Sequence, residues 1–81
     1  MHKNIFIQYY AILREQTGKS EEIHGTLAQN AVELFLELKE RYGFFLNPEN
    51  CKVAINDEFK DWQTALEDQD RIIFIPPVAG G

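Results

Sequence analysis

The sequence predicts an α+β domain in which a mixed sheet is covered on one face by one main helix. The first observation is the run Lys3–Ala11, whose alternating side chains are typical of a strand with one core face. The second is the amphipathic stretch Leu27–Tyr42, which has the apolar spacing of a helix. The third is Arg71–Ile75, a β-branched and aromatic run that is apolar on both faces, as in a central strand.

The size and composition of the chain exclude several classes of function. Its 81 residues are enough for one domain with a single modest core. A net charge of −5 and the absence of a Lys/Arg stripe argue against binding to nucleic acid. Cys51 is the only cysteine, and no acidic run has the ordered ligand loop of a calcium site, so we expect no metal site. We also expect no membrane span and no signal peptide, and therefore a cytoplasmic location.

The first strand and a weaker second strand are predicted to form a hairpin. In the first strand the aromatic side chains of Phe6 and Tyr10 lie opposite the core face. Residues Thr17–Ser20 have the composition of a turn, and Ser20–His24 is a plausible return strand. The core face of the first strand is assigned to Ile5, Ile7 and Tyr9.

The main helix is predicted over Leu27–Tyr42 with two possible caps at its start. Thr26 can cap the first turn, or Asn30 can do so together with Glu33 three residues later. Gly43 ends the helix, because glycine tolerates the left-handed conformation best. The face toward the core carries Leu27, Ala31, Leu34, Phe35, Leu38 and Tyr42.

Short elements connect the helix to the last strand. The apolar run Phe44–Leu46 is expected to close the bottom of the core. Lys52–Asn56 is predicted to be a strand with Val53 and Ile55 facing inward. The remaining expectations are a turn at Asp57–Glu58, a brief return at Phe59–Asp61, a helical turn or loop anchored by Trp62 and Leu66, and a turn at Glu67–Asp70.

Pairing the last strand parallel to the first, with the helix across one face, gives a β-grasp (ubiquitin-like) fold. Pro76 and Pro77 then end the sheet, because proline has no N–H for the ladder and fixes φ. The side chains shrink toward Gly80 and Gly81, so nothing shields the terminal carboxyl group. We therefore expect a β-grasp domain over residues 1–76 and a flexible Gly-Gly tail over residues 77–81.

The segment Ile72–Gly81 resembles the tail of the ubiquitin-like sulfur carriers, and most closely that of the small subunits of molybdopterin synthase. That family ends in a Phe-Pro-Pro-Val-(small)-Gly-Gly pattern. In this chain Ile75 stands in place of the phenylalanine of the pattern, and Phe74 precedes it. Tyr10–Glu15 matches an aromatic-Ala-x-x-Arg-Glu block of the same family. The turn before the last strand departs from the pattern, because Gln69 stands where the family usually has glycine.

The resemblance implies that the Gly81 carboxylate is adenylated by a ubiquitin-activating-type adenylyltransferase that uses ATP, and is then converted to a thiocarboxylate by a sulfur donor system. The sulfur would be delivered to the large subunit of molybdopterin synthase, to build the dithiolene of molybdopterin. This chain would bind no cofactor itself, and we find no active site of its own, so its status as an enzyme stays open. The residues implied to enter the large subunit with Gly81 are Pro76, Pro77, Val78, Ala79 and Gly80.

Three other roles are possible: two of them need the same activated C-terminal glycine, and the third does not use the tail. The chain could carry sulfur for thiazole synthesis or for tRNA thiolation, act as a ubiquitin-like protein modifier, or be a plain interaction module with an inert tail. Pro76 and Pro77 favour the molybdopterin branch, by resemblance only.

A docking surface is predicted on the sheet face that the helix leaves uncovered. A soluble monomer seldom exposes a contiguous apolar patch, so we expect a larger protein to cover it. Self-association, or cover by the Glu67–Asp70 turn, are the alternatives. Arg14 is added to this surface because it matches the family's arginine. The predicted partner-binding residues are Phe6, Tyr10, Arg14, Phe59, Ile73 and Ile75, with Ala54 on the same face.

Overall fold

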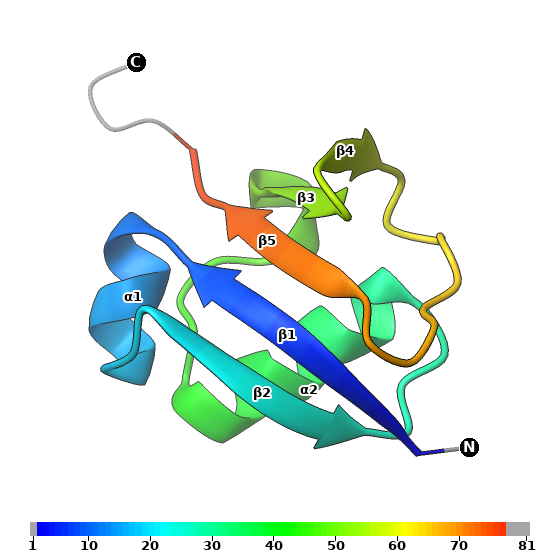
Figure 1. The fold of residues 1–81 in the computed structure, drawn as a ribbon. Coiled ribbons are helices and arrows are strands. Elements are labelled where there is room, and N and C mark those ends of the chain that lie inside the picture. The colour runs from blue at the N-terminus through cyan, green and yellow to red at the C-terminus, as the bar shows by residue number, and fades with distance from the viewer. Residues whose placement is uncertain (1, 78–81) are drawn as a thin grey trace.

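The computed structural model describes residues 2–77, which form one mixed sheet with the long helix packed behind it (Figure 1). Within these residues, no helix has both the length and the apolar character needed to cross a membrane. The elements in chain order are β1 Lys3–Tyr9, α1 Ala11–Thr17, β2 Glu21–Thr26, α2 Ala31–Tyr42, the 3-10 helix η1 Pro48–Asn50, β3 Lys52–Ile55, β4 Glu58–Lys60 and β5 Arg71–Ile75.

The five strands lie in the order β2-β1-β5-β3-β4, so the last strand occupies the centre of the sheet (Figure 1). β5 runs parallel to β1, with Ile7 opposite Ile72, and antiparallel to β3, with Val53 opposite Phe74. The outer pairs β1–β2 and β3–β4 are antiparallel; β3 and β4 form a hairpin, whereas α1 lies between β1 and β2, where the sequence predicts a hairpin turn. This topology confirms the predicted β-grasp fold and the central place of the apolar strand Arg71–Ile75.

The core lies between the sheet and α2, and alternate residues of each strand supply it. Phe74 meets Phe35 of α2 edge-on, with ring centroids 5.2 Å apart, and stacks against Trp62 at 5.9 Å. These contacts join the central strand, the helix and the loop after β4 into one aromatic cluster. The predicted inward residues Ile5, Ile7, Tyr9, Val53 and Ile55 are all buried.

α2 begins later than the sequence predicts. Asn30 is its N-cap, and its side chain accepts a hydrogen bond from the backbone N–H of Glu33 at 3.0 Å, so the second of the two predicted caps is correct. Thr26 instead ends β2, which extends two residues beyond the predicted strand. Leu27 therefore lies in the loop before the helix and is 68% exposed, which corrects its assignment to the core. Gly43 ends the helix at φ 72°, as predicted.

The short helix α1 was not predicted, because seven residues give too few turns for a clear periodicity. It follows β1 directly through Tyr10, and its first residue, Ala11, has the positive φ of 51°. Leu13 is fully buried and anchors α1 to the core. Gly18 closes the helix at φ 74°, in the left-handed conformation that favours glycine.

A carboxylate on the helix side of the sheet joins three elements. Glu22 of β2 accepts hydrogen bonds from the hydroxyl groups of Tyr9 at 2.6 Å and Tyr42 at 2.8 Å, and it pairs with Lys19 at 3.2 Å. Burial raises the pKa of Glu22, but these hydrogen bonds together outweigh it, so the pKa lies below its ordinary value. Burial, and then the bond to Glu22, raise the pKa of Tyr9. Both groups therefore keep the protonation states that this bond needs at neutral pH.

The polar residues near the end of β2 are also structural. His24 is buried, and its Nε2 atom lies 2.5 Å from a carboxylate oxygen of Glu37. The other oxygen of Glu37 accepts from the Thr26 hydroxyl at 2.8 Å. His24 is thus a bonded core residue.

Two connecting segments test the remaining predictions. Phe44 is buried and Leu46 packs partly against the core, but Phe45 is 79% exposed, so only part of the predicted apolar plug is correct. The segment from Trp62 to Leu66 is a loop, not a helical turn, with both end residues packed against the core.

Candidate functional site

The C-terminal residues 76–81, which we call the arm, leave the domain at the end of the central strand, beside α1. β5 ends at Ile75, which is half-buried; Pro76 is buried and Pro77 is exposed. An apolar groove of about 480 Å3 surrounds this point. One side of the groove is the end of β5, and the other is the start of α1. The lining residues are Tyr10, Ala11, Ile12, Glu15, Ile75, Pro76 and Pro77.

The corner between β1 and α1 brings these two sides together. β1 and β5 are parallel, so both strands end at the same edge of the sheet, with Tyr9 opposite Phe74. The positive φ of Ala11 then turns the chain sharply into α1, and a non-glycine residue adopts that conformation at a cost of about 1 kcal/mol. The strained corner thus places Tyr10 on the same groove as Ile75, whereas the sequence analysis placed both residues on the uncovered face of the sheet.

Val78, Ala79, Gly80 and Gly81 lie outside the described residues. Their predicted entry into a partner, the predicted chemistry at the Gly81 carboxyl group, and the flexibility of the tail therefore stay predictions. The described part of the tail begins with a stiff Pro-Pro pair whose first member is packed and whose second is exposed.

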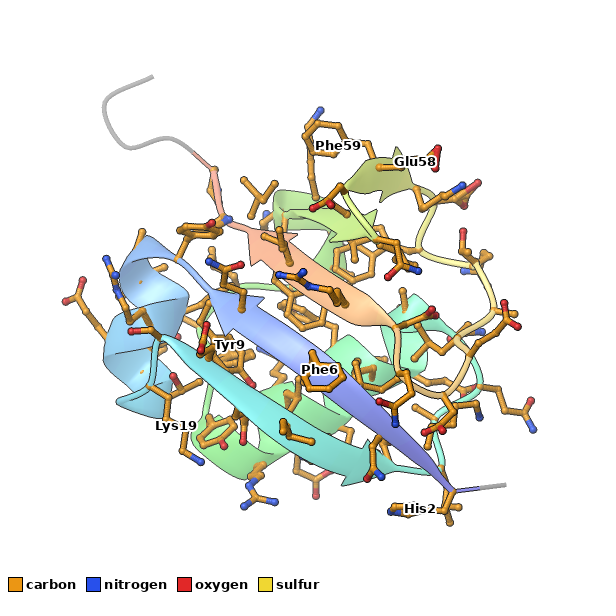
Figure 2. The ribbon with its side chains drawn as sticks, in the orientation of Figure 1. His2, Phe6, Tyr9, Lys19, Glu58 and Phe59 are labelled. Carbon is orange, nitrogen blue, oxygen red and sulfur yellow. The ribbon has the colours of Figure 1, made fainter. Side chains whose placement is uncertain are left out.

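The sheet face away from α2 carries the predicted apolar residues, and we call it the open face. Paired residues of neighbouring strands point to the same side, so the register places Gln8, Ile73, Ala54 and Phe59 in one row across the sheet. Phe59 is 70% exposed, Ile73 is half-buried and Ala54 is buried. Phe6 lies on this face and is 38% exposed (Figure 2).

The open face is hollowed between β2, β1 and β5 into a groove of about 580 Å3, which we call the open-face groove. Ile23 is opposite Phe6 in the ladder and is 66% exposed, so it extends the apolar surface to the edge strand. The sequence analysis missed Ile23, because the signal for β2 was too weak to fix its register. Arg71 lines the same groove from β5.

The turn Glu67–Asp70 does not cover this face. Hydrogen bonds hold this turn against the start of β1. The backbone N–H of Asn4 donates to the Asp68 carboxylate at 2.7 Å, and the backbone N–H of Phe6 donates to the backbone carbonyl of Asp70 at 3.0 Å. The bond from Asn4 holds the pKa of Asp68 below its ordinary value. Gln69 lines one end of the open-face groove, and Phe6 remains exposed beside it. The alternative of an intramolecular cover is therefore excluded for Phe6.

The predicted partner-binding residues thus fall into two groups. Phe6, Ile73 and Phe59 lie on the open face, and Tyr10 and Ile75 line the groove at the arm base. Arg14 is exposed on α1 and lines neither groove, so nothing in this geometry joins it to the other residues. Within residues 2–77, no three His, Cys, Asp or Glu side chains are grouped to hold a metal ion.

Comparison with solved structures supports the same fold. One chain of the protein–protein complex of subunits 1 and 2 of molybdopterin-converting factor from Helicobacter pylori 26695 is 29% identical, with a TM-score of 0.63 and complete coverage of both chains. Small archaeal modifier protein 1 from Methanosarcina acetivorans is 23% identical, with a TM-score of 0.78 over 100% of this chain and 99% of that one. The HVO 2177 protein of Haloferax volcanii is 22% identical, with a TM-score of 0.81 over 99% of this chain and 88% of that one.

Comparison at the level of sequence gives the family. No curated protein matches the chain. The model of the ThiS family matches residues 7–81, which includes every residue of the groove at the arm base, all residues of the open-face groove except Phe6, and the whole tail. The chain therefore belongs to the ThiS family of ubiquitin-like sulfur carriers.

Proposed function

We propose that this protein is the sulfur-carrying small subunit of a molybdopterin synthase. The observation that carries the proposal is the sequence of residues 75–81, Ile-Pro-Pro-Val-Ala-Gly-Gly, which begins at the last residue of the central strand of a β-grasp domain. The likeness to a chain of the Helicobacter pylori complex of molybdopterin-converting factor subunits supports this branch of the family.

The proposed chemistry takes place at the Gly81 carboxylate. A carboxylate is a poor electrophile, so an activating enzyme first joins it to the AMP part of ATP and releases pyrophosphate. A sulfur nucleophile then attacks the acyl carbon, the C–O bond to AMP breaks, and a thiocarboxylate is left on Gly81. Its sulfur is a soft nucleophile that attacks the carbon of a precursor held by the large subunit.

In this proposal the chain contributes positioning, and its partners contribute the acid and base groups. The groove at the arm base lies at the end of β5 from which the arm departs, and the open-face groove lies on the uncovered face of the sheet beside the first part of the same strand. A partner that binds both surfaces fixes the direction of the arm. This raises the effective concentration of Gly81 in the partner's site. The missing side chains of Gly80 and Gly81 let the arm enter a slot only as wide as a backbone.

The second candidate is a ubiquitin-like modifier or a carrier for another sulfur pathway, such as thiazole synthesis or tRNA thiolation. The likeness to small archaeal modifier protein 1 over the whole chain favours the modifier among these. Both candidates need an activated Gly81, so only the acceptor separates them.

A reconstituted synthase tests the proposal. The chain, its activating enzyme, a sulfide source and the large subunit are combined with the molybdopterin precursor, and dithiolene formation is measured. Deletion of Gly81 should abolish product while the far-UV circular dichroism spectrum and the melting temperature stay unchanged. Gly80→Val should block activation or delivery by its bulk, whereas Glu40→Ala on the exposed face of α2 serves as the control with full activity.

Product formation by the truncated chain would contradict the proposal. A thiocarboxylate that forms normally on Gly81, but passes to no precursor with the large subunit present, would assign the chain to another branch of the family.

A further inference from the structure

Arg71 occupies an unusual place for a charged residue. It begins β5, the central strand, and lies opposite Phe6 in the parallel ladder. Its backbone bonds to Asn56, donating to the side-chain oxygen at 3.0 Å and accepting from the backbone N–H at 2.8 Å. Its side chain lines the open-face groove together with Phe6, Ile23 and Ile73. A permanent cation thus stands beside apolar side chains in a groove that polar and acidic residues also line.

This cation has no partner in the described part of the chain, although the protein carries 13 acidic residues against 8 basic ones. Among residues 2–77, the Arg71 guanidinium takes part in no ion pair and no hydrogen bond. The neighbouring Asp70 carboxylate is engaged by the Asn56 amide at 2.9 Å and the Glu67 N–H at 2.8 Å. Arg71 is therefore held in the groove by its backbone, with its five donors available to another molecule.

Resting on the proposed function, in which a protein partner covers the open face, we infer that this partner places an acidic side chain, flanked by apolar ones, into the open-face groove to pair with Arg71. Arginine binds a carboxylate through two parallel hydrogen bonds, and it is enriched at the centres of protein interfaces. The apolar flanks would rest on Phe6 and Ile73, which exclude water from the pair and strengthen it.

The acids on the rim of the groove set the register of the partner. Glu21 begins β2 at one wall, and Asp57 lies in the turn between β3 and β4 at the other end. A carboxylate displaced along the face meets one of these acids and is repelled, whereas one opposite Arg71 is attracted. The combination of one cation and two rim acids thus disfavours other docking positions, as well as favouring the correct one.

Affinity measurements with the large subunit of molybdopterin synthase from the same genome test the inference. Binding of the full chain is measured by calorimetry for Arg71→Gln and Arg71→Glu. The matched control is Lys60→Gln, because Lys60 lies on the edge strand β4 and pairs with Glu58 at 3.8 Å, outside the groove. We expect about tenfold weaker binding for Arg71→Gln, a still larger loss for Arg71→Glu, and a change of less than about twofold for the control.

A zero-length cross-link identifies the partner group directly. Arg71→Lys introduces a primary amine that a carbodiimide joins to a contacting carboxylate as an amide, and mass spectrometry of the digest locates the bond. We expect residue 71 to be linked to an Asp or Glu of the large subunit with apolar neighbours, and no such link in Arg71→Gln.

The outcomes separate the inference from the proposed function. Wild-type binding with unchanged affinity of Arg71→Glu, or a cross-link only to Glu21 or Asp57 of the same chain, would overturn the inference and leave the proposed function standing. If the wild-type chain fails to bind the large subunit, the proposed function fails, and the inference about its partner fails with it.

Discussion

The two faces of the sheet use the same strands in opposite ways. On the helix side, Ile7, Phe74 and their neighbours are at most a few per cent exposed, and the polar groups among them, such as Glu22, are bonded several times over. On the open face, Phe6 and Phe59 remain exposed, and the Arg71 guanidinium lacks a partner within residues 2–77. Because side chains alternate along a strand, one face can build the fold while the other stays free for recognition.

This contrast teaches where substitutions should act. Changes on the helix side should lower stability, and changes on the open face should lower affinity for a partner with little effect on stability.

The largest effect is expected from the aromatic cluster in the core. Phe35→Ala removes a fully buried ring that contacts Phe74 and Trp62, and should lower the free energy of unfolding by about 3–5 kcal/mol. Phe59→Ala removes a ring of the same size from the open face and should change it by less than about 0.5 kcal/mol. Urea denaturation followed by circular dichroism measures both. Similar losses in the two variants would contradict the division between the faces.

The second prediction concerns the groove at the arm base. In the proposed complex, in which a large synthase subunit covers this groove, Ile75→Lys or Tyr10→Asp would bury a charge without a partner and should weaken binding by about 2 kcal/mol or more. Isothermal calorimetry measures the affinity, and Leu36→Lys, on the exposed side of α2, is the control. Unchanged binding of both groove variants would remove the arm base from the docking surface.

The third prediction is a dependence of stability on pH through Glu22. The pKa of this carboxylate is lowered in the folded state from an ordinary value of 4.5, so its contribution to stability is complete above that value and is lost as the pH falls through the folded-state pKa. Glu22→Gln should cost about 1–2 kcal/mol at pH 7 and should flatten the fall in stability below pH 4.5. Denaturation curves from pH 7 to pH 3 provide the measurement. Parallel curves for the two proteins would refute the assignment.

The smallest effect is expected in the turn before β5. Gln69 adopts φ 74°, a left-handed conformation that lowers the stability of the fold by about 1 kcal/mol when the residue has a side chain. Glycine has no Cβ, so a glycine at this position would avoid part of that strain. Gln69→Gly should therefore raise the free energy of unfolding by roughly 0.5 kcal/mol. Gln63→Gly, at a loop position without a positive φ, should lower it slightly. A loss of stability in Gln69→Gly would show that the side chain contributes more than the strain costs.

Local patterns explain why most of the fold could be predicted from the sequence. The alternation in Lys3–Ala11 and the caps at Asn30 and Gly43 depend only on neighbouring residues, and the structure follows them. Leu27 was misassigned because helical spacing alone does not show that β2 continues to Thr26. The helix α1 was missed because its seven residues give too few turns for a clear periodicity, and because no residue type indicates the positive φ at Ala11 where it begins.

The candidate site was less predictable, because it depends on strand register. The positions of Phe6, Ile73 and Phe59 on one face follow from alternation, and they were predicted. Ile23 and the place of Arg71 among apolar side chains become visible only when β2, β1 and β5 are aligned. The bonds of Glu22 to Tyr9 and Tyr42 join residues 13 and 20 positions apart, so no local pattern reveals them.

We propose that Gly81 is the reactive end of the molecule and that the domain before it provides the surface to which partner proteins bind. Intact-mass spectrometry of the protein purified from its native cells tests this claim most directly. We expect a fraction of the chain in which one oxygen is replaced by one sulfur, with the change located in the C-terminal peptide. A terminal carboxylate that is never found carrying sulfur or AMP, in cells that make molybdopterin, would contradict it.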